Sequence, residues 1–212
     1  QRPTRNSPIF DALDALDDPT DDAAEDLLVE VVSAIWYGFD SPQHIDALIA
    51  ERAARGDPFD IDKVKTTAAN EFAKKRIAEA GWPPITDCDR LDRAFVRLQQ
   101  QGICALHCAG DTQEEGLESV SRVLNDEVHS GLDHHGYCFY YSQDIDNALD
   151  NKGLLLAHGH VDRSEAPDDE HVAVAEAICE ALRQEGLEVV WSGSTKRRIG
   201  LPQLWWQRRT PG

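Results

Sequence analysis

Apolar side chains in the first third of the chain recur every three or four residues, which is the spacing of one helix face. Three such runs follow one another, and they begin near Asp22, Ser41 and Asp60. Ser41 and Asp60 are good N-cap residues, and the proline after Ser41 is favoured at the first helical position. The pattern predicts that residues 1–82 form a helical N-terminal region, a small bundle with no recognisable chemistry.

The pattern changes at Gly81-Trp82-Pro83-Pro84, because neither proline can continue a helix. Beyond this predicted linker, helical periods alternate with short apolar runs that are typical of strands. Helix-start signals stand at Thr86 or Asp87, at Thr112 and at Ser142, and a further helical period runs from Val172 to Gly186. The predicted strands cover residues 103–109, 137–142, 154–158, 187–191, 198–201 and 205–208.

The order of these elements predicts an α+β domain over residues 83–212. Strand, helix, strand, short helix, strand, helix and strand fit a ferredoxin-like βαββαβ sheet with added C-terminal strands, preceded by the small helical bundle. Two helices would then cover one face of the sheet. The run Gly136–Asp144 would supply its central strand and end in a polar corner.

Charge and cysteine content limit the classes of partner and compartment. The formal net charge is −18, although every charged residue after Glu188 is basic. An acidic surface repels nucleic acid and anionic membranes, so we expect neither as a partner, but an unknown protein or a small molecule. The five cysteines lie in apolar settings, which favours reduced thiols, and no leader or membrane-spanning run is visible. We therefore expect a soluble, cytoplasmic protein whose native start lies outside this chain, since it begins at Gln1 and contains no methionine.

Two polar corners are the predicted ligand-binding residues. The turn Asp111-Thr112-Gln113 follows one predicted strand, and Gln143 and Asp144 follow another. Strand ends at one edge of a sheet can present side chains and free backbone N–H groups to a ligand. Simple helix capping by Thr112 and Ser142 is the competing interpretation.

The segment Leu154–Asp162 is the one candidate for metal chemistry. Its His158, His160 and Asp162 resemble the HxHxD run of the metallo-β-lactamase superfamily. Residues two apart on a strand share a face, so the two imidazoles of such a run can bind one metal ion. Arg163 stands where that superfamily has its next histidine, and too little chain follows to build that fold. Two histidines at a strand end without a metal are the favoured interpretation, and no catalytic residue or cofactor is predicted.

Two other groups have structural interpretations. Cys104 and Cys108 would lie roughly 13 Å apart on one strand, too far to share an ion or a disulfide, so buried structural thiols are favoured. Trp205 and Trp206 beside Arg208 and Arg209 could stack on bases or bind a carboxylate-rich partner, but a protected edge strand is favoured.

Several short motifs occur in order along the second part of the chain. They are Thr86-Asp87-Cys88-Asp89-Arg90-Leu91-Asp92, Ala109-Gly110-Asp111-Thr112-Gln113, Gly136–Asp144 and Trp206-Gln207-Arg208-Arg209. Together they resemble an uncharacterised bacterial domain-of-unknown-function family over residues 87–209. The resemblance implies no activity, and it implies an aromatic residue where His158 stands here.

No nucleophile elbow, phosphate loop or dinucleotide fingerprint occurs in the sequence. The first functional hypothesis is therefore a non-enzymatic binding or regulatory module. A small metal-assisted hydrolase that uses His158, His160 and Asp162 is the alternative, and an acidic inhibitor of a basic protein is a further one.

Overall fold

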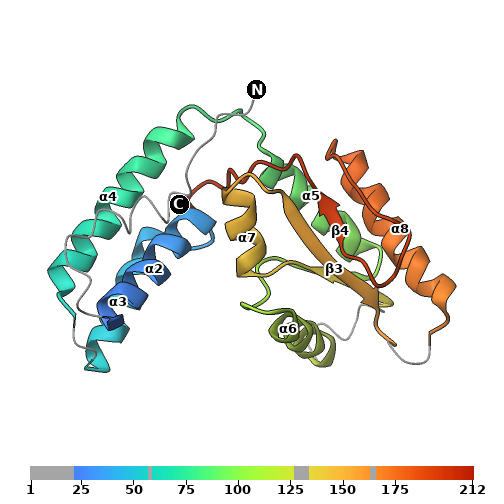
Figure 1. Ribbon diagram of the computed structural model, residues 1–212, viewed down its shortest axis with the longest axis horizontal. Helices are drawn as coiled ribbons and strands as arrows, with labels where there is room; N and C mark the ends of the chain where they lie inside the picture. Colours follow the sequence, from blue (N-terminus) through green and yellow to red (C-terminus); the bar gives the residue numbers. More distant parts are fainter. Residues whose placement is uncertain (1–21, 57–58, 127–133, 163–165) are drawn as a thin grey trace. The chain divides into compact units, whose positions relative to one another are not determined.

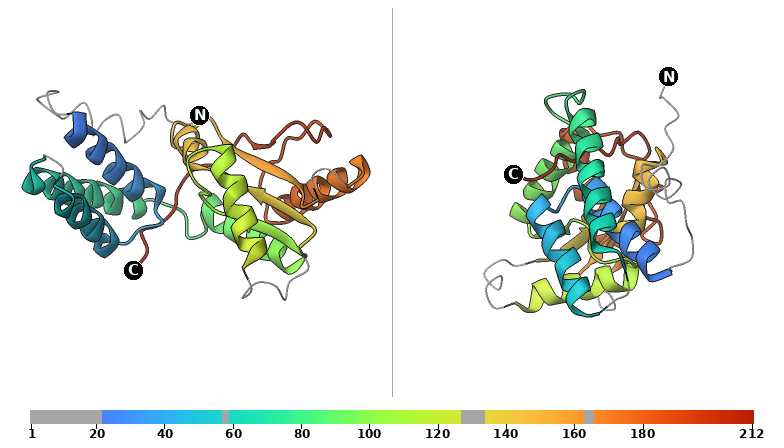
Figure 2. Two further views of the ribbon diagram at one scale, coloured as in Figure 1. Left: turned by 90° about the horizontal axis from the view of Figure 1, so that it is seen from below. Right: turned by 90° about the vertical axis from the view of Figure 1, so that its left-hand side faces the viewer.

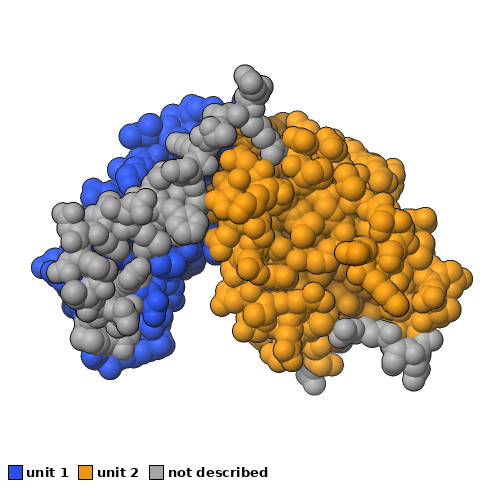
Figure 3. Space-filling view, viewed as in Figure 1, with its two compact units in different colours: residues 1–84, 207–212 blue, residues 85–206 orange. Residues whose placement is uncertain are grey.

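The computed structural model describes residues 22–56, 59–126, 134–162 and 166–212. The chain divides into two compact units, which Figure 3 colours separately. The helical unit comprises Gln1–Pro84 together with Gln207–Gly212, and the sheet unit comprises Ile85–Trp206. No helix in the described ranges is both long and apolar enough to cross a bilayer.

The helical unit contains the three predicted helices, α2 (Asp22–Tyr37), α3 (Pro42–Ala54) and α4 (Ile61–Glu79). Their start signals act as expected: the Ser41 side chain accepts a hydrogen bond from the backbone of His44, and the Asp60 side chain accepts from Asp62 and Lys63. The apolar faces meet in a core that includes Val31, Ile35, Ile45, Ile49, Val64 and Phe72.

The last residues of the chain also belong to the helical unit. The Thr210 backbone N–H and hydroxyl both donate to Glu79 Oε1 at 2.8 Å, and the Arg208 guanidinium lies 4.5 Å from the Phe39 ring centroid. The prediction of a strand at residues 205–208 is therefore wrong. Within this segment the Trp205 backbone N–H donates to the Asp87 carboxylate, and the Arg208 side chain lies over Phe39.

The sheet unit is built on a mixed four-stranded sheet in the order β1-β2-β3-β4 (Figure 1). The strands are β1 (Ile103–Leu106), β2 (Gly136–Phe139), β3 (Leu154–His160) and β4 (Ile199–Leu201). The pair β1–β2 is parallel, while β2–β3 and β3–β4 are antiparallel. The predicted α+β class is confirmed.

The ferredoxin-like arrangement is not confirmed. In a split βαβ unit another strand separates the two parallel strands, whereas β1 and β2 are direct neighbours with Ala105 opposite Cys138. The predicted strand at residues 187–191 contributes only an isolated bridge between Val190 and Gly200. Trp191, the last residue of that predicted strand, instead donates its indole N–H to the carbonyls of Ser194 and Arg197.

Helices cover both faces of the sheet (Figures 1 and 2). A Cβ at Gly136 would lie 2.6 Å from Val174 of α8 (Asp168–Gln184), which places α8 and its neighbour α5 (Asp87–Gln100) on one face. A Cβ at Gly116 of α6 (Gln113–Asn125) would lie 2.1 Å from the Phe139 ring. Positions 136 and 139 point to opposite faces, so α6 and α8 do not share the one face that was predicted for them.

Candidate functional site

A cleft of about 470 Å³ opens in the sheet unit beside the end of β3. Four parts of the unit line it: the start of α6, the strands β2 and β3, the start of α8, and the loop before β4. The lining residues are Gln113, Leu117, Tyr137, Ala157, His158, Gly159, Asp168, His171, Thr195, Lys196, Arg197 and Arg198.

Tyr137 of β2 and Ala157 and Gly159 of β3 form the sheet side of the cleft. Ala157 and Gly159 lie on the face of β3 that they share with Tyr137, which pairs with Gly159 in register. A Cβ at Gly159 would lie only 2.7 Å from the Tyr137 hydroxyl. The glycine therefore makes room for the tyrosine, and the two residues together shape the floor of the cleft.

The wall opposite α6 is the loop Ser194–Arg198, and side-chain hydrogen bonds hold it in place. The Trp191 indole N–H donates to the carbonyls of Ser194 at 3.1 Å and Arg197 at 3.3 Å. His158 Nε2 lies 3.0 Å from the same Arg197 carbonyl, and its ring meets Trp191 edge-on at 5.8 Å. A carbonyl only accepts, so His158 carries its proton on Nε2. Burial lowers the pKa of His158, which favours this neutral form.

Arg198 is the fixed residue of this wall. Its guanidinium pairs with the Asp144 carboxylate and donates to the Tyr141 hydroxyl at 3.1 Å and the Leu155 carbonyl at 2.7 Å. Asp144 is 2% exposed, so burial raises its pKa, and the Arg198 charge opposes that rise. The Arg198 guanidinium therefore chiefly serves to neutralise a buried carboxylate and to tie β4 to the corner after β2.

Lys196 and Arg197 are the exposed cations of the cleft. Within the ranges that the structure describes, neither the Lys196 ammonium nor the Arg197 guanidinium has a carboxylate at ion-pair distance. Among the described residues that line the cleft, Asp168 carries the one carboxylate, against Lys196, Arg197 and the already paired Arg198. This wall of the cleft is therefore locally positive in a chain whose formal charge is −18.

The structure brings the two predicted polar corners together but uses most of their residues locally. The Ser142 backbone N–H donates to the Gly110 carbonyl at 3.1 Å, because the parallel strands β1 and β2 end at the same edge. Gln113 is the predicted ligand-binding residue that lines the cleft. A ligand-binding role for any of these residues stays a prediction.

The other members of that predicted set have identifiable positions. Thr112 accepts a hydrogen bond from the Glu115 backbone, and the Asp111 backbone donates to the Glu115 carboxylate at 2.6 Å. Asp144 is buried against Arg198, and it also accepts from the Tyr141 backbone at 3.2 Å. Gln143 is exposed in α7 (Ser142–Leu149). Ser142 is the first helical residue and Tyr141 the N-cap, so the prediction that Ser142 caps α7 is wrong by one position.

The three residues of the metal candidate do not converge. His158 faces the Arg197 carbonyl, whereas His160 Nδ1 accepts from the Asp162 backbone at 3.1 Å, and His160 Nε2 lies 3.5 Å from Glu170. Among the residues described, no group of three or more His, Cys, Asp or Glu side chains could hold a metal ion. The metal-assisted hydrolase gains no support from this arrangement.

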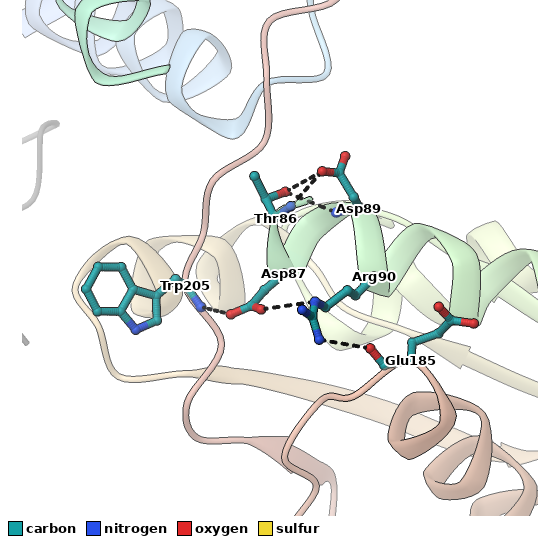
Figure 4. A network of polar contacts seen from close by, with 6 residues as sticks. All are labelled: Thr86, Asp87, Asp89, Arg90, Glu185 and Trp205. Carbon is teal, nitrogen blue, oxygen red and sulfur yellow. Dashed lines mark hydrogen bonds and ion pairs between the residues drawn. The ribbon is translucent and has the colours of Figure 1, made fainter. Parts of the chain in front are cut away.

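The motif that begins at Thr86 has a structural role, which Figure 4 shows. Thr86 and Asp89 form a capping box at the start of α5. The Asp87 carboxylate accepts from the Trp205 backbone at 3.0 Å and lies 4.0 Å from Arg90, which donates to the Glu185 carbonyl at 3.2 Å. The motif thus fastens the end of α8 and the segment at Trp205 to one helix start.

The sequence patterns did not indicate Lys196 and Arg197 as candidate functional residues. The stretch after Glu188 is recognisable as basic in the sequence, but its neighbours in the fold are not. Only the tertiary structure brings this stretch beside the first turns of α6 and α8.

Comparison with known proteins gives a family and no activity. The family model described as "Domain of unknown function (DUF6891)" matches residues 20–210, a span that contains all four strands and every residue of the cleft. No curated protein and no solved structure matches the chain.

Proposed function

The chain belongs to the DUF6891 family of domains of unknown function, and from its own geometry we propose that the sheet unit is a non-enzymatic binding or regulatory module. Its ligand is a small molecule held in the cleft between α6, β3 and the loop Ser194–Arg198. The buried free thiols suit a reducing compartment, so the module would act in the cytoplasm.

The cleft itself is the observation that carries this proposal. Its volume of about 470 Å³ falls in the range of small-molecule sites, about 300–1,000 Å³, and its mostly polar and charged lining suits a polar ligand rather than an apolar one. A loop held by His158 and Trp191 forms one wall, so little ordering would accompany binding. Gln113, the predicted residue on the opposite side, can supply both a donor and an acceptor to a ligand.

A blocking substitution tests the site. Gln113→Trp places a large ring at an exposed position in the first turn of α6, beside the cleft. Gln143→Trp is the matched control, because it makes the same exchange at an exposed position in the first turn of α7. A fragment library is screened against the full chain by ligand-observed NMR, and each hit is repeated with both variants.

We expect compounds that bind the unmodified chain to be lost with Gln113→Trp and kept with Gln143→Trp. Hits that survive Gln113→Trp would place the binding site elsewhere. Loss with Gln143→Trp alone would return the site to the corner at Gln143 and Asp144.

A further inference from the structure

We infer that the ligand of this cleft carries an anionic group, a phosphate or a carboxylate, and that Lys196 and Arg197 bind it. The inference rests on the proposed function and adds the chemical class of the ligand. It also assigns to Lys196 and Arg197 a binding role that the sequence did not suggest.

The distribution of charge around the cleft is the first argument. Some cations of this acidic chain pair with carboxylates, as Arg52 does with Glu30 and Arg97 with Glu185. Other exposed cations, among them Lys65 and Arg93, form no ion pair within the described ranges. Within the described ranges, Lys196 and Arg197 have no such partner, although both are exposed. Lys196 and Arg197 differ from those other cations because they are adjacent and both line a concave site, where they outnumber the one described carboxylate, Asp168. This arrangement favours an anion as the occupant.

The support of the loop is the second argument. The Arg197 backbone N–H donates to the Ser194 carbonyl at 3.0 Å, and the Lys196 backbone N–H donates to the Ser194 hydroxyl at 3.3 Å. His158 and Trp191 hold the Arg197 carbonyl from the other side. The backbone that carries both cations is therefore fixed before a ligand arrives. An arginine fork can donate two parallel hydrogen bonds to two oxygens of one phosphate or carboxylate, and the lysine adds a point charge.

The size of the anion follows from the surrounding charge. Salt screens exposed charges beyond about 8 Å at physiological ionic strength, so a small anion in the cleft interacts mainly with the nearby cations. A nucleic acid or an anionic membrane would extend past that distance over a chain of charge −18. The geometry therefore points to a small anionic metabolite rather than a polyanion.

The test compares two charge-reversed variants of the full chain. Lys196→Glu with Arg197→Glu removes the proposed donors. Lys65→Glu with Arg93→Glu is the control, since it changes the net charge equally at exposed positions on α4 and α5. Inorganic phosphate and citrate are titrated separately to about 10 mM, with binding followed by amide chemical shifts in two-dimensional NMR spectra.

We expect at least one of the two anions to shift the amides of residues 195–198. The Lys196/Arg197 variant should weaken this binding at least about tenfold, which corresponds to the loss of one charge-assisted hydrogen bond. The control variant should change it by less than about twofold. Binding of phosphate alone identifies a phosphate ligand, and binding of citrate alone identifies a carboxylate ligand.

Three results would overturn the inference. Equal weakening in both variants would mean that the anion senses only the net charge. A neutral fragment could bind in a way that Gln113→Trp blocks, while neither anion binds or displaces that fragment. The cleft is then a ligand site but not an anion site, and the proposed function stands. If no compound of any charge binds at the cleft, the proposed function fails as well.

Discussion

Replacement of Arg198 by methionine tests how the cleft wall is held together. The Arg198 guanidinium is the counter-ion of Asp144, which is 2% exposed. Methionine keeps the apolar length of the side chain but removes the charge and the bonds to Tyr141 and Leu155. The buried Asp144 carboxylate would then keep the Tyr141 backbone N–H as a donor, without a neighbouring positive charge.

The expected loss is large. Removal of one partner of a buried ion pair costs about 3–5 kcal/mol, because the remaining charge is left in a medium of low dielectric constant. A typical domain is stabilised by about 5–15 kcal/mol, so the loss is a substantial share of the total. Asp144→Leu combined with Arg198→Met removes both charges and should recover most of the loss, except about 1 kcal/mol for the bond to the Tyr141 backbone.

The destabilisation caused by Arg198→Met should depend on pH, because Asp144 can take up a proton. Burial raises the pKa of Asp144 above the ordinary value of 3.8, and Arg198 opposes this rise, so Arg198→Met should raise that pKa further. A group whose folded pKa is raised contributes stability below its unfolded pKa and loses that contribution as the pH rises through the folded pKa. The destabilisation by Arg198→Met should therefore be greatest at neutral pH and should shrink toward pH 3.8 as Asp144 takes up its proton.

Urea unfolding of the full chain measures the effect, with tryptophan fluorescence and far-ultraviolet circular dichroism as the two probes. Arg93→Met is the matched control, because Arg93 is exposed on α5, and it should change the free energy of unfolding by less than about 0.5 kcal/mol. A loss below about 1 kcal/mol for Arg198→Met at neutral pH would refute the reasoning, since that is the range of exposed pairs. A loss that stays constant on acidification would do the same.

Two further predictions concern titrating side chains. In the native chain a thiol reagent should label Cys108 rapidly, because Cys108 is partly exposed, and should label the other thiols only on unfolding. Those thiols are buried, and burial raises the pKa of Cys104 to about 11, which disfavours its reactive thiolate. Fast reaction of a second thiol would contradict the burial of Cys88, Cys104, Cys138 and Cys179. Burial lowers the pKa of His158, so its contribution to stability is complete above the unfolded pKa of 6.5 and is lost as the pH falls through the folded value. The advantage in urea midpoint of the unmodified chain over His158→Gln should thus be smaller at about pH 5.5 than at about pH 7.5, and an unchanged or larger advantage would count against a neutral His158.

The sequence by itself determined the local elements of this protein. Ser41, Asp60, Thr86 and Thr112 each mark a helix start, and each side chain accepts a hydrogen bond from a backbone N–H two or three residues later. The apolar periods located the helices, and the short apolar runs located β1, β2, β3 and β4. These signals can be read from the chain because the atoms that satisfy them lie within one turn of each other. The predicted resemblance to an uncharacterised family of domains of unknown function is confirmed by the family match over residues 20–210.

Only the tertiary structure decided the order of the sheet and the content of the site. In the structure β1 pairs directly with β2, and α6 and α8 lie on opposite faces of the sheet. Both features depend on which apolar surfaces meet. The sequence does not decide this, because the pattern of a buried strand is compatible with several neighbours. Asp144 and Arg198 are 54 residues apart, so nothing near Asp144 announces that it is buried against a guanidinium. Lys196 and Arg197 become a candidate binding site because His158 and Trp191 hold their loop beside the cleft. Gln113 of α6 also lines this cleft.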